Sequence, residues 1–245
     1  MEIRSEYVTL EVDDGSTMRA WVARPGGPAA HPGLLVFQEA FGVNGHIRDV
    51  TERFAREGYL AIAPELFHRT APGFEGPYDD FPSTVPHMRA LRDDLMEADH
   101  RAAFNWLKAN GAPPKQIAAV GYCMGGRASF LAALAVPIAC GVSYYGGGIG
   151  PSAASPGLLG RVHALHAPML FFWGGEDKHL TPEYRQAVVT ALREAKKSFV
   201  NVEISDADHG FFCDARPSYS ATAAEQAWPL TLAFLRSYLA APARR

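Results

Sequence analysis

Short apolar runs alternate with longer amphipathic segments along most of the chain. Each run is nearly continuous in apolar character, which is typical of strands buried on both faces of a sheet. Between the runs, apolar residues recur at helical spacing. Strands that alternate with helices predict βαβ units and a mostly parallel, doubly wound α/β sheet. The predicted strands are 32–38, 59–64, 116–121, 139–146, 168–174 and 198–205, and the predicted helices are 46–58, 88–109, 124–135, 183–196 and 219–240.

Two segments depart from this alternation. Near the N-terminus, "YVTLEV" and "TMRAWVA" flank "DDGS" and predict an antiparallel hairpin. After the strand at 59–64, residues 70–86 are rich in proline and glycine and are predicted to form one long loop. Loops of this length in compact domains are usually functional, and many act as lids.

Length and composition narrow the class of protein. A chain of 245 residues, of which 48% are hydrophobic, suits one α/β domain over residues 1–245. The formal net charge of −3 and the lack of a long basic run give no sign of a nucleic-acid or membrane partner. Three cysteines and an N-terminus without an apolar signal core favour a cytoplasmic protein. No cofactor motif and no local metal-ligand spacing is present, so we expect neither group.

The candidate catalytic residues lie where the predicted strands end. Cys123 follows the strand at 116–121, Asp177 follows the strand at 168–174, and His209 follows the strand at 198–205. Because the carboxyl ends of parallel strands meet at one edge of a sheet, these three side chains are expected to converge. The chain order is nucleophile, acid, histidine, as in α/β-hydrolases.

The stretch "GYCMGG" at 121–126 matches the G-x-S-x-G nucleophile elbow, with cysteine in place of serine. A sharp strand-to-helix turn strains the backbone at Cys123 and requires small residues at Gly121 and Gly125. Cys123 would then stand at a helix N-terminus, which favours a thiolate. The N–H groups of Met124 and Ala40 are the expected oxyanion-hole donors.

Each assignment has a plainer alternative. Cys123 could be a small packed residue, and His209 a solvated turn residue. Glu176, Asp206 and Asp208 compete with Asp177 as the partner of the histidine. Cys140 and Cys213 are expected to be structural thiols.

The residues described above, together with "FQEAFGVNGHIRDV", "FFWGGEDKHLTPE" and "DADHGFF", resemble the dienelactone hydrolase (carboxymethylenebutenolidase) family. This family is a cysteine branch of the α/β-hydrolase superfamily, and the resemblance covers nearly the whole chain. It implies an α/β-hydrolase fold with a triad of Cys123, His209 and Asp177, and it implies that Glu39 lies near the thiol as its partner in the resting enzyme. A structural carboxylate is the alternative for Glu39.

The resemblance also suggests which residues line the substrate pocket. Tyr145 and Phe41 would contact substrate, and Arg69 would brace the loop beside them. Family members that act on dienelactone hold its carboxylate with arginines. Here Cys213 stands four positions beyond His209, the nearest arginine is Arg216, and the loop at 70–86 contains no arginine. The sequence therefore leaves open whether the substrate carries a carboxylate.

The resulting hypothesis is a hydrolase that opens a small-molecule lactone or activated ester through a Cys123 thioester, acting as a monomer or weak homodimer. One alternative is a general carboxylesterase without a carboxylate clamp. The other is a hydrolase-like scaffold that performs no acyl transfer and whose Cys123 is redox-active or inert.

Overall fold

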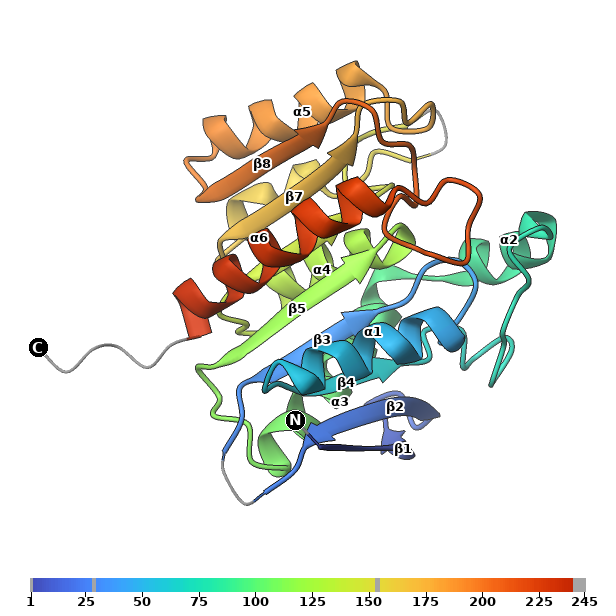
Figure 1. The fold of residues 1–245 in the computed structure, drawn as a ribbon, viewed down its shortest axis with the longest axis vertical. Coiled ribbons are helices and arrows are strands. Elements are labelled where there is room, and N and C mark those ends of the chain that lie inside the picture. Colours follow the sequence, from blue (N-terminus) through green and yellow to red (C-terminus); the bar gives the residue numbers. More distant parts are fainter. Residues whose placement is uncertain (1, 28–29, 153–154, 240–245) are drawn as a thin grey trace, which may run out of the picture.

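The computed structural model describes residues 2–27, 30–152 and 155–239, and its centre is an eight-stranded sheet (Figure 1). The strand order is β1-β2-β4-β3-β5-β6-β7-β8. β1 pairs antiparallel with β2 and β2 antiparallel with β4, whereas the remaining neighbours are parallel. The predicted doubly wound, mostly parallel sheet with an N-terminal hairpin is confirmed. The strands are β1 Ile3–Glu11, β2 Thr17–Pro25, β3 Gly33–Phe37, β4 Leu60–Pro64, β5 Ile117–Tyr122, β6 Gly141–Tyr144, β7 Met169–Gly174 and β8 Phe199–Ile204.

Helices cover both faces of this sheet. α1 and α6 lie on the face toward the viewer in Figure 1, and α3 and α4 pack together on the opposite face. Every residue of β3, β4, β5, β6 and β7 is buried, as their continuous apolar character predicts. The helices are α1 Gly45–Arg56, α2 Phe81–Ala90, α3 Asp93–Ala109, α4 Met124–Ala135, α5 Pro182–Glu194 and α6 Ala221–Leu239, with a 3₁₀ helix at Leu159–Ala164.

The region between β4 and β5 corrects the sequence prediction. The single helix expected at 88–109 is two helices, α2 and α3, separated by extended backbone at Leu91 and Arg92. α2 begins inside the segment 70–86, for which the sequence predicts a loop. The Asp80 side chain caps it by accepting from the Ser83 N–H at 3.3 Å, and a proline occupies its first turn. Proline is well suited to a first helical turn, so Pro82 is compatible with the start of a helix.

The loop before α2 is fastened to the turn after β3. A backbone bridge joins Gly42 to Glu75, and the Gly76 N–H donates to the Phe41 carbonyl at 3.1 Å. A Cβ atom at Gly42 would collide with the Phe74 carbonyl, and Gly42 has a φ of 84°, so glycine is required at this crossing. The loop therefore lies against the edge of the sheet where β3 ends.

Helix length and polarity bear on membrane association. Within the described part of the chain, no helix is both long enough and apolar enough to cross a membrane.

Candidate active site

Cys123 occupies the tight turn between β5 and α4. Its φ of 55° and ψ of −118° lie outside the regions that L-residues normally adopt. The turn is held by the Cys123 N–H, which donates to the Tyr144 carbonyl at 3.0 Å, and by the Cys123 carbonyl, which accepts from Gly126 at 2.9 Å. This geometry leaves the Cys123 side chain partly exposed at the carboxyl edge of the sheet.

The glycines beside Cys123 are required for the reason that the sequence suggests. A Cβ atom at Gly121 would collide with the backbone of Gly125, and one at Gly125 would collide with the carbonyls of Phe37 and Gln38. Strand β5, helix α4 and the end of β3 thus approach more closely than any side chain would permit. The close approach brings the turn after β3 next to the nucleophile turn.

His209 and Asp177 meet at the same edge. His209 Nδ1 lies 2.7 Å from Asp177 Oδ2, and the Asp177 side chain is completely buried. The other oxygen, Oδ1, accepts from the N–H groups of His179 and Leu180 at 2.8 and 3.0 Å. Both carboxylate oxygens therefore have partners, and the carboxylate is fixed in its orientation toward the ring.

The competing carboxylates lie elsewhere. Glu176, Asp206 and Asp208 are exposed, and Asp208 accepts from the backbone N–H of His209 rather than from its ring. Burial acts to raise the pKa of Asp177, but its hydrogen bond and charge interaction with His209 outweigh burial, and the pKa is lowered. Asp177 is the carboxylate that contacts the imidazole.

The protonated form of His209 is strongly favoured. Burial acts to lower the pKa of this ring, but the adjacent Cys123 sulfur and the Asp177 carboxylate raise it to about 10. The protonated ring would lie between Cys123 and Asp177, two groups that can carry negative charge.

Glu39 is completely buried in the turn after β3. Its Oε1 accepts from Arg216 Nη1 at 3.1 Å, whereas Oε2 has no hydrogen-bond partner within the described residues. No hydrogen bond joins Glu39 to Cys123 in that same part of the chain, so its role as thiol partner stays a prediction. The contact that is present pairs Glu39 with a guanidinium.

Arg216 is the charged residue of this site that the sequence does not identify as a site residue. Burial acts to lower its pKa, but charge interactions with Glu39 and Cys123 outweigh burial, and the pKa is raised. Its guanidinium carbon lies 5.7 Å from the centre of the Phe41 ring. A Cβ atom at Gly210 would collide with the Arg216 guanidinium, and Gly210 has a φ of 83°. Gly210 therefore leaves space for the guanidinium of Arg216, which stands seven positions after His209.

The two predicted oxyanion donors lie in the turns after β5 and after β3. Met124 is the first residue of α4, where the N–H has no acceptor within the helix. Ala40 is completely buried, and no described residue accepts its N–H. The Gln38 side chain braces the turn by accepting from the Leu66 N–H at 3.0 Å and donating to the Glu39 carbonyl at 3.3 Å.

Aromatic residues form the walls of the site. The Tyr145 ring lies 5.1 Å from the His209 ring, and its buried hydroxyl has no partner within the described residues. Phe41 packs against Tyr78, with ring centres 4.6 Å apart. Tyr78, a further residue that sequence reasoning misses, accepts from Asn44 Nδ2 at 2.9 Å and from the Cys213 thiol at 3.2 Å. Its position in a long loop beside the predicted site is the available signal.

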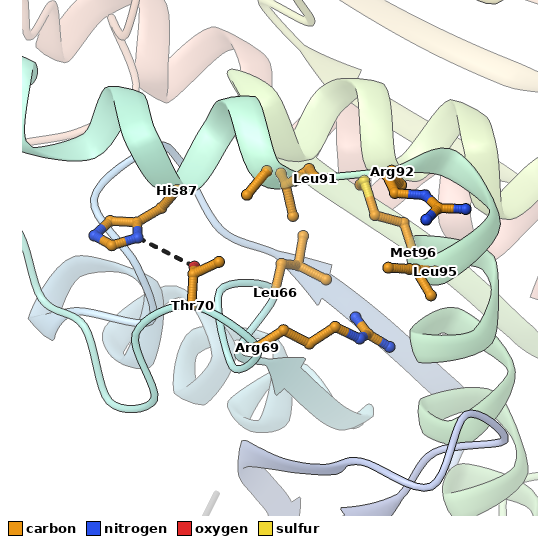
Figure 2. A pocket seen from close by; sticks show the side chains of 9 residues that line it. Leu66, Arg69, Thr70, His87, Leu91, Arg92, Leu95 and Met96 are labelled. Atoms are coloured by element: carbon orange, nitrogen blue, oxygen red, sulfur yellow. Dashed lines mark hydrogen bonds between the residues drawn. The ribbon is translucent and has the colours of Figure 1, made fainter.

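Arg69 does not contact this cluster. Its guanidinium forms two hydrogen bonds with Asp99, at 2.9 and 2.8 Å, and a third with Asp14 at 2.8 Å. Figure 2 shows Arg69 with Thr70 and His87 around a cavity of about 20 Å³, which has room for about one water molecule. These contacts brace the segment after β4, and they do not support a substrate-binding role for Arg69.

Comparison with known proteins places the chain in a family. Residues 18–239 match the family model described as "Dienelactone hydrolase family". A protein of Synechocystis sp. named "Putative carboxymethylenebutenolidase" is 34% identical over 93% of this chain and 94% of its own length. One of the same name from Escherichia coli K12 is 37% identical over 91% of this chain and 84% of its own length.

A solved structure agrees with these relatives. The crystal structure of a "Putative Dienelactone Hydrolase" from Klebsiella pneumoniae superposes with a TM-score of 0.89 at 31% identity, over 97% of this chain and 100% of that one. The sheet order and the matched length confirm the α/β-hydrolase fold. The chain belongs to the dienelactone hydrolase family.

Proposed function

We propose that this protein hydrolyses a lactone or an activated carboxylic ester through a thioester on Cys123. The observation that carries the proposal is the 2.7 Å contact between His209 and the buried Asp177, beside the strained turn that presents Cys123. A nucleophile, a base and a group that orients the base are the parts that covalent acyl transfer needs.

The reaction follows from these positions. His209 takes the proton from Cys123 Sγ, and the thiolate attacks the carbonyl carbon to form a tetrahedral oxyanion. The N–H groups of Met124 and Ala40 stabilise that oxyanion. When the carbon–oxygen bond breaks, His209 returns the proton to the departing alkoxide. Water, deprotonated by His209, then attacks the thioester and releases the carboxylic acid and the Cys123 thiol.

A thiolate is a better leaving group than an alkoxide, so the tetrahedral intermediate from a simple alkyl ester mostly reverts to starting material. Enol esters, aryl esters and unsaturated lactones have better leaving groups and are the expected substrates. The names of the relatives point to the same class, since a carboxymethylenebutenolide is an unsaturated lactone. Comparable turnover of a peptide amide would contradict this substrate preference.

Arg216 bears on whether the substrate is charged. It is the cation closest in chain position to His209, and its guanidinium is partly exposed while paired with Glu39. A substrate carboxylate could share this guanidinium, and the proposed substrate therefore carries one. Because Glu39 already neutralises Arg216, a general carboxylesterase that takes uncharged esters is the second candidate. A dienelactone and its methyl ester, compared by kcat/KM, distinguish the two.

A burst experiment tests the acyl transfer directly. With p-nitrophenyl acetate we expect turnover, and rapid quenching followed by intact-protein mass measurement should detect an acetyl adduct on Cys123. Cys123→Ala should abolish both turnover and adduct, and Cys140→Ala, which changes a buried thiol elsewhere, should retain both. Folded protein without turnover or adduct would exclude acyl transfer and favour the redox or inert scaffold.

A further inference from the structure

Outside the proposed triad, three side chains of types that can ligate metals lie close together. His46 comes from the first turn of α1, and Cys213 and Asp214 come from the loop after β8. One ligand atom from each residue lies within 4.8 Å of the other two, and His46 Nδ1 is 3.4 Å from Asp214 Oδ1. The described part of the chain offers no other such group of three. Sequence spacing could not reveal it, because its two segments are about 170 positions apart.

We propose that His46, Cys213 and Asp214 form a zinc-binding site. Thiolate, imidazole and carboxylate ligands together suit Zn²⁺, which binds them in tetrahedral geometry at about 2.0–2.3 Å. The ligand atoms need to move only slightly toward a common centre. Three protein ligands leave a fourth position for water. On binding, the Cys213 thiol loses its proton to solvent and its sulfur bonds to the metal.

The surroundings of His46 support the assignment independently. Its side chain is 3% exposed, and Nε2 has no hydrogen-bond partner within the described residues. A buried polar atom without a partner costs free energy. A ring nitrogen that coordinates a metal ion no longer lacks a partner. Asp214 is exposed and lines a surface groove with Arg53 and Trp228, which provides a route from solvent.

Tyr78 and Asn44 provide a second layer of contacts. Asn44 Nδ2 and the Cys213 thiol both donate to the Tyr78 hydroxyl oxygen, at 2.9 and 3.2 Å. The hydroxyl proton of Tyr78 has no acceptor within the described residues. Once Cys213 is a metal-bound thiolate, Tyr78 can donate that proton to the sulfur. Hydrogen bonds of this kind orient metal ligands and commonly change metal affinity about 10–100-fold.

A metal at this site would connect the loop after β8, which carries His209 and Arg216, to α1. The Cys213 N–H donates to the Gly210 carbonyl at 3.0 Å, and the Cys213 carbonyl accepts from Arg216 at 3.1 Å. Cys213 thus sits between His209 and Arg216 in a run of tight turns. Holding its side chain against His46 restrains the loop that carries both residues, so zinc should raise the thermal stability of the protein.

Metal titration of the purified full-length chain tests the proposal. After chelator treatment and one addition of Zn²⁺, we expect one equivalent to remain per chain after desalting, with a higher Tm. Co²⁺ should produce the near-ultraviolet thiolate charge-transfer band of a Cys-ligated site. Asp214→Asn should weaken binding about tenfold or more, and because Asp214 is exposed this variant should keep the Tm of the metal-free protein. Cys213→Ser should remove the cobalt band.

Two controls separate this site from the proposed active site, which also contains a cysteine and a histidine. Cys123→Ser and Cys140→Ser should bind zinc as the unmodified protein does. Tyr78→Phe should bind it more weakly but keep the cobalt band. Loss of binding in Cys123→Ser, binding unaffected by Asp214→Asn and His46→Gln, or no retained zinc at all would each overturn the proposal.

Discussion

Two of the histidine–aspartate pairs in the described part of the chain, His209–Asp177 and His68–Asp99, differ in what faces the far side of the ring. His209 contacts Asp177 at 2.7 Å, and its side chain is 13% exposed beside Cys123. His68 contacts Asp99 at 3.1 Å, is 2% exposed, and has the Thr17 carbonyl 3.1 Å from its other nitrogen. Both nitrogens of His68 therefore face structural acceptors.

The aspartates differ as well. Asp177 receives two backbone N–H groups and the imidazole, whereas Asp99 receives the imidazole and both terminal nitrogens of Arg69. The Asp99 network links the hairpin turn, the segment after β4 and helix α3. A histidine beside an aspartate therefore does not by itself mark a candidate active site. A reactive side chain at the second nitrogen and access for substrate distinguish the two pairs.

The largest expected change is the loss of activity when His209 is replaced. His209→Gln should lower kcat/KM for p-nitrophenyl acetate by about 10⁴-fold, because the general base and the imidazolium are both lost. His68→Gln should retain most of kcat and lose thermal stability instead. Equal losses of activity in both folded variants would remove the distinction between the pairs.

For the two aspartates, the larger loss of stability is expected at Asp99 and the larger loss of activity at Asp177. Asp99→Asn removes the charge that compensates Arg69 inside the protein, and breaking a buried pair costs about 3–5 kcal/mol. Urea unfolding should show this loss, with kcat preserved in the fraction that stays folded. Asp177→Asn should lose activity with a smaller change in unfolding free energy. A stability change for Asp99→Asn within error would contradict the structural role of the network.

A further effect is a dependence of stability on pH. Because the pKa of His209 rises from an ordinary value near 6.5 to about 10 on folding, its protonation stabilises the folded state. This contribution is complete below about pH 6.5 and is lost as the pH rises to about 10. The difference in Tm between the unmodified protein and His209→Gln should therefore shrink over that range.

A second variant sharpens the pH measurement. Of the groups that raise the pKa of His209, Cys123 has the largest effect, so Cys123→Ala should weaken the pH dependence. An unchanged profile in Cys123→Ala would indicate that the thiol does not interact with the ring.

The parts of the site that the sequence reveals are those with local rules. The turn at Cys123 needs glycines on both sides, and this pattern between a buried strand and a helix is characteristic of a nucleophile elbow. The positions of Asp177 and His209 follow from parallel strands whose ends share one edge. These features depend on turn geometry and on the edge that parallel strands share, and both can be predicted from local sequence patterns.

The features that the sequence does not predict depend mostly on how side chains from loops are placed in three dimensions. Arg216 reaches Glu39 because Gly210 leaves space for its guanidinium, and that space exists only in three dimensions. Arg69 follows a strand end, as a pocket residue would, but its bonds to Asp14 and Asp99 direct it toward the hairpin turn and α3. Helix α2 escapes prediction because Pro82 in its first turn is equally typical of a loop, and because Pro86 lies inside the helix, where proline is unfavourable.

The strand order has a consequence for how the chain assembles during synthesis. The hairpin of β1 and β2 can form early, but its place in the sheet is beside β4, and β4 in turn is joined to β5 only through β3. Strand β6 supplies the carbonyl that fixes the Cys123 turn, and β8 precedes His209. A nascent chain therefore completes its cysteine turn well before His209 emerges from the ribosome. If Cys123 acts as proposed, its reactivity toward esters should appear only after His209 has emerged and β8 has joined the sheet.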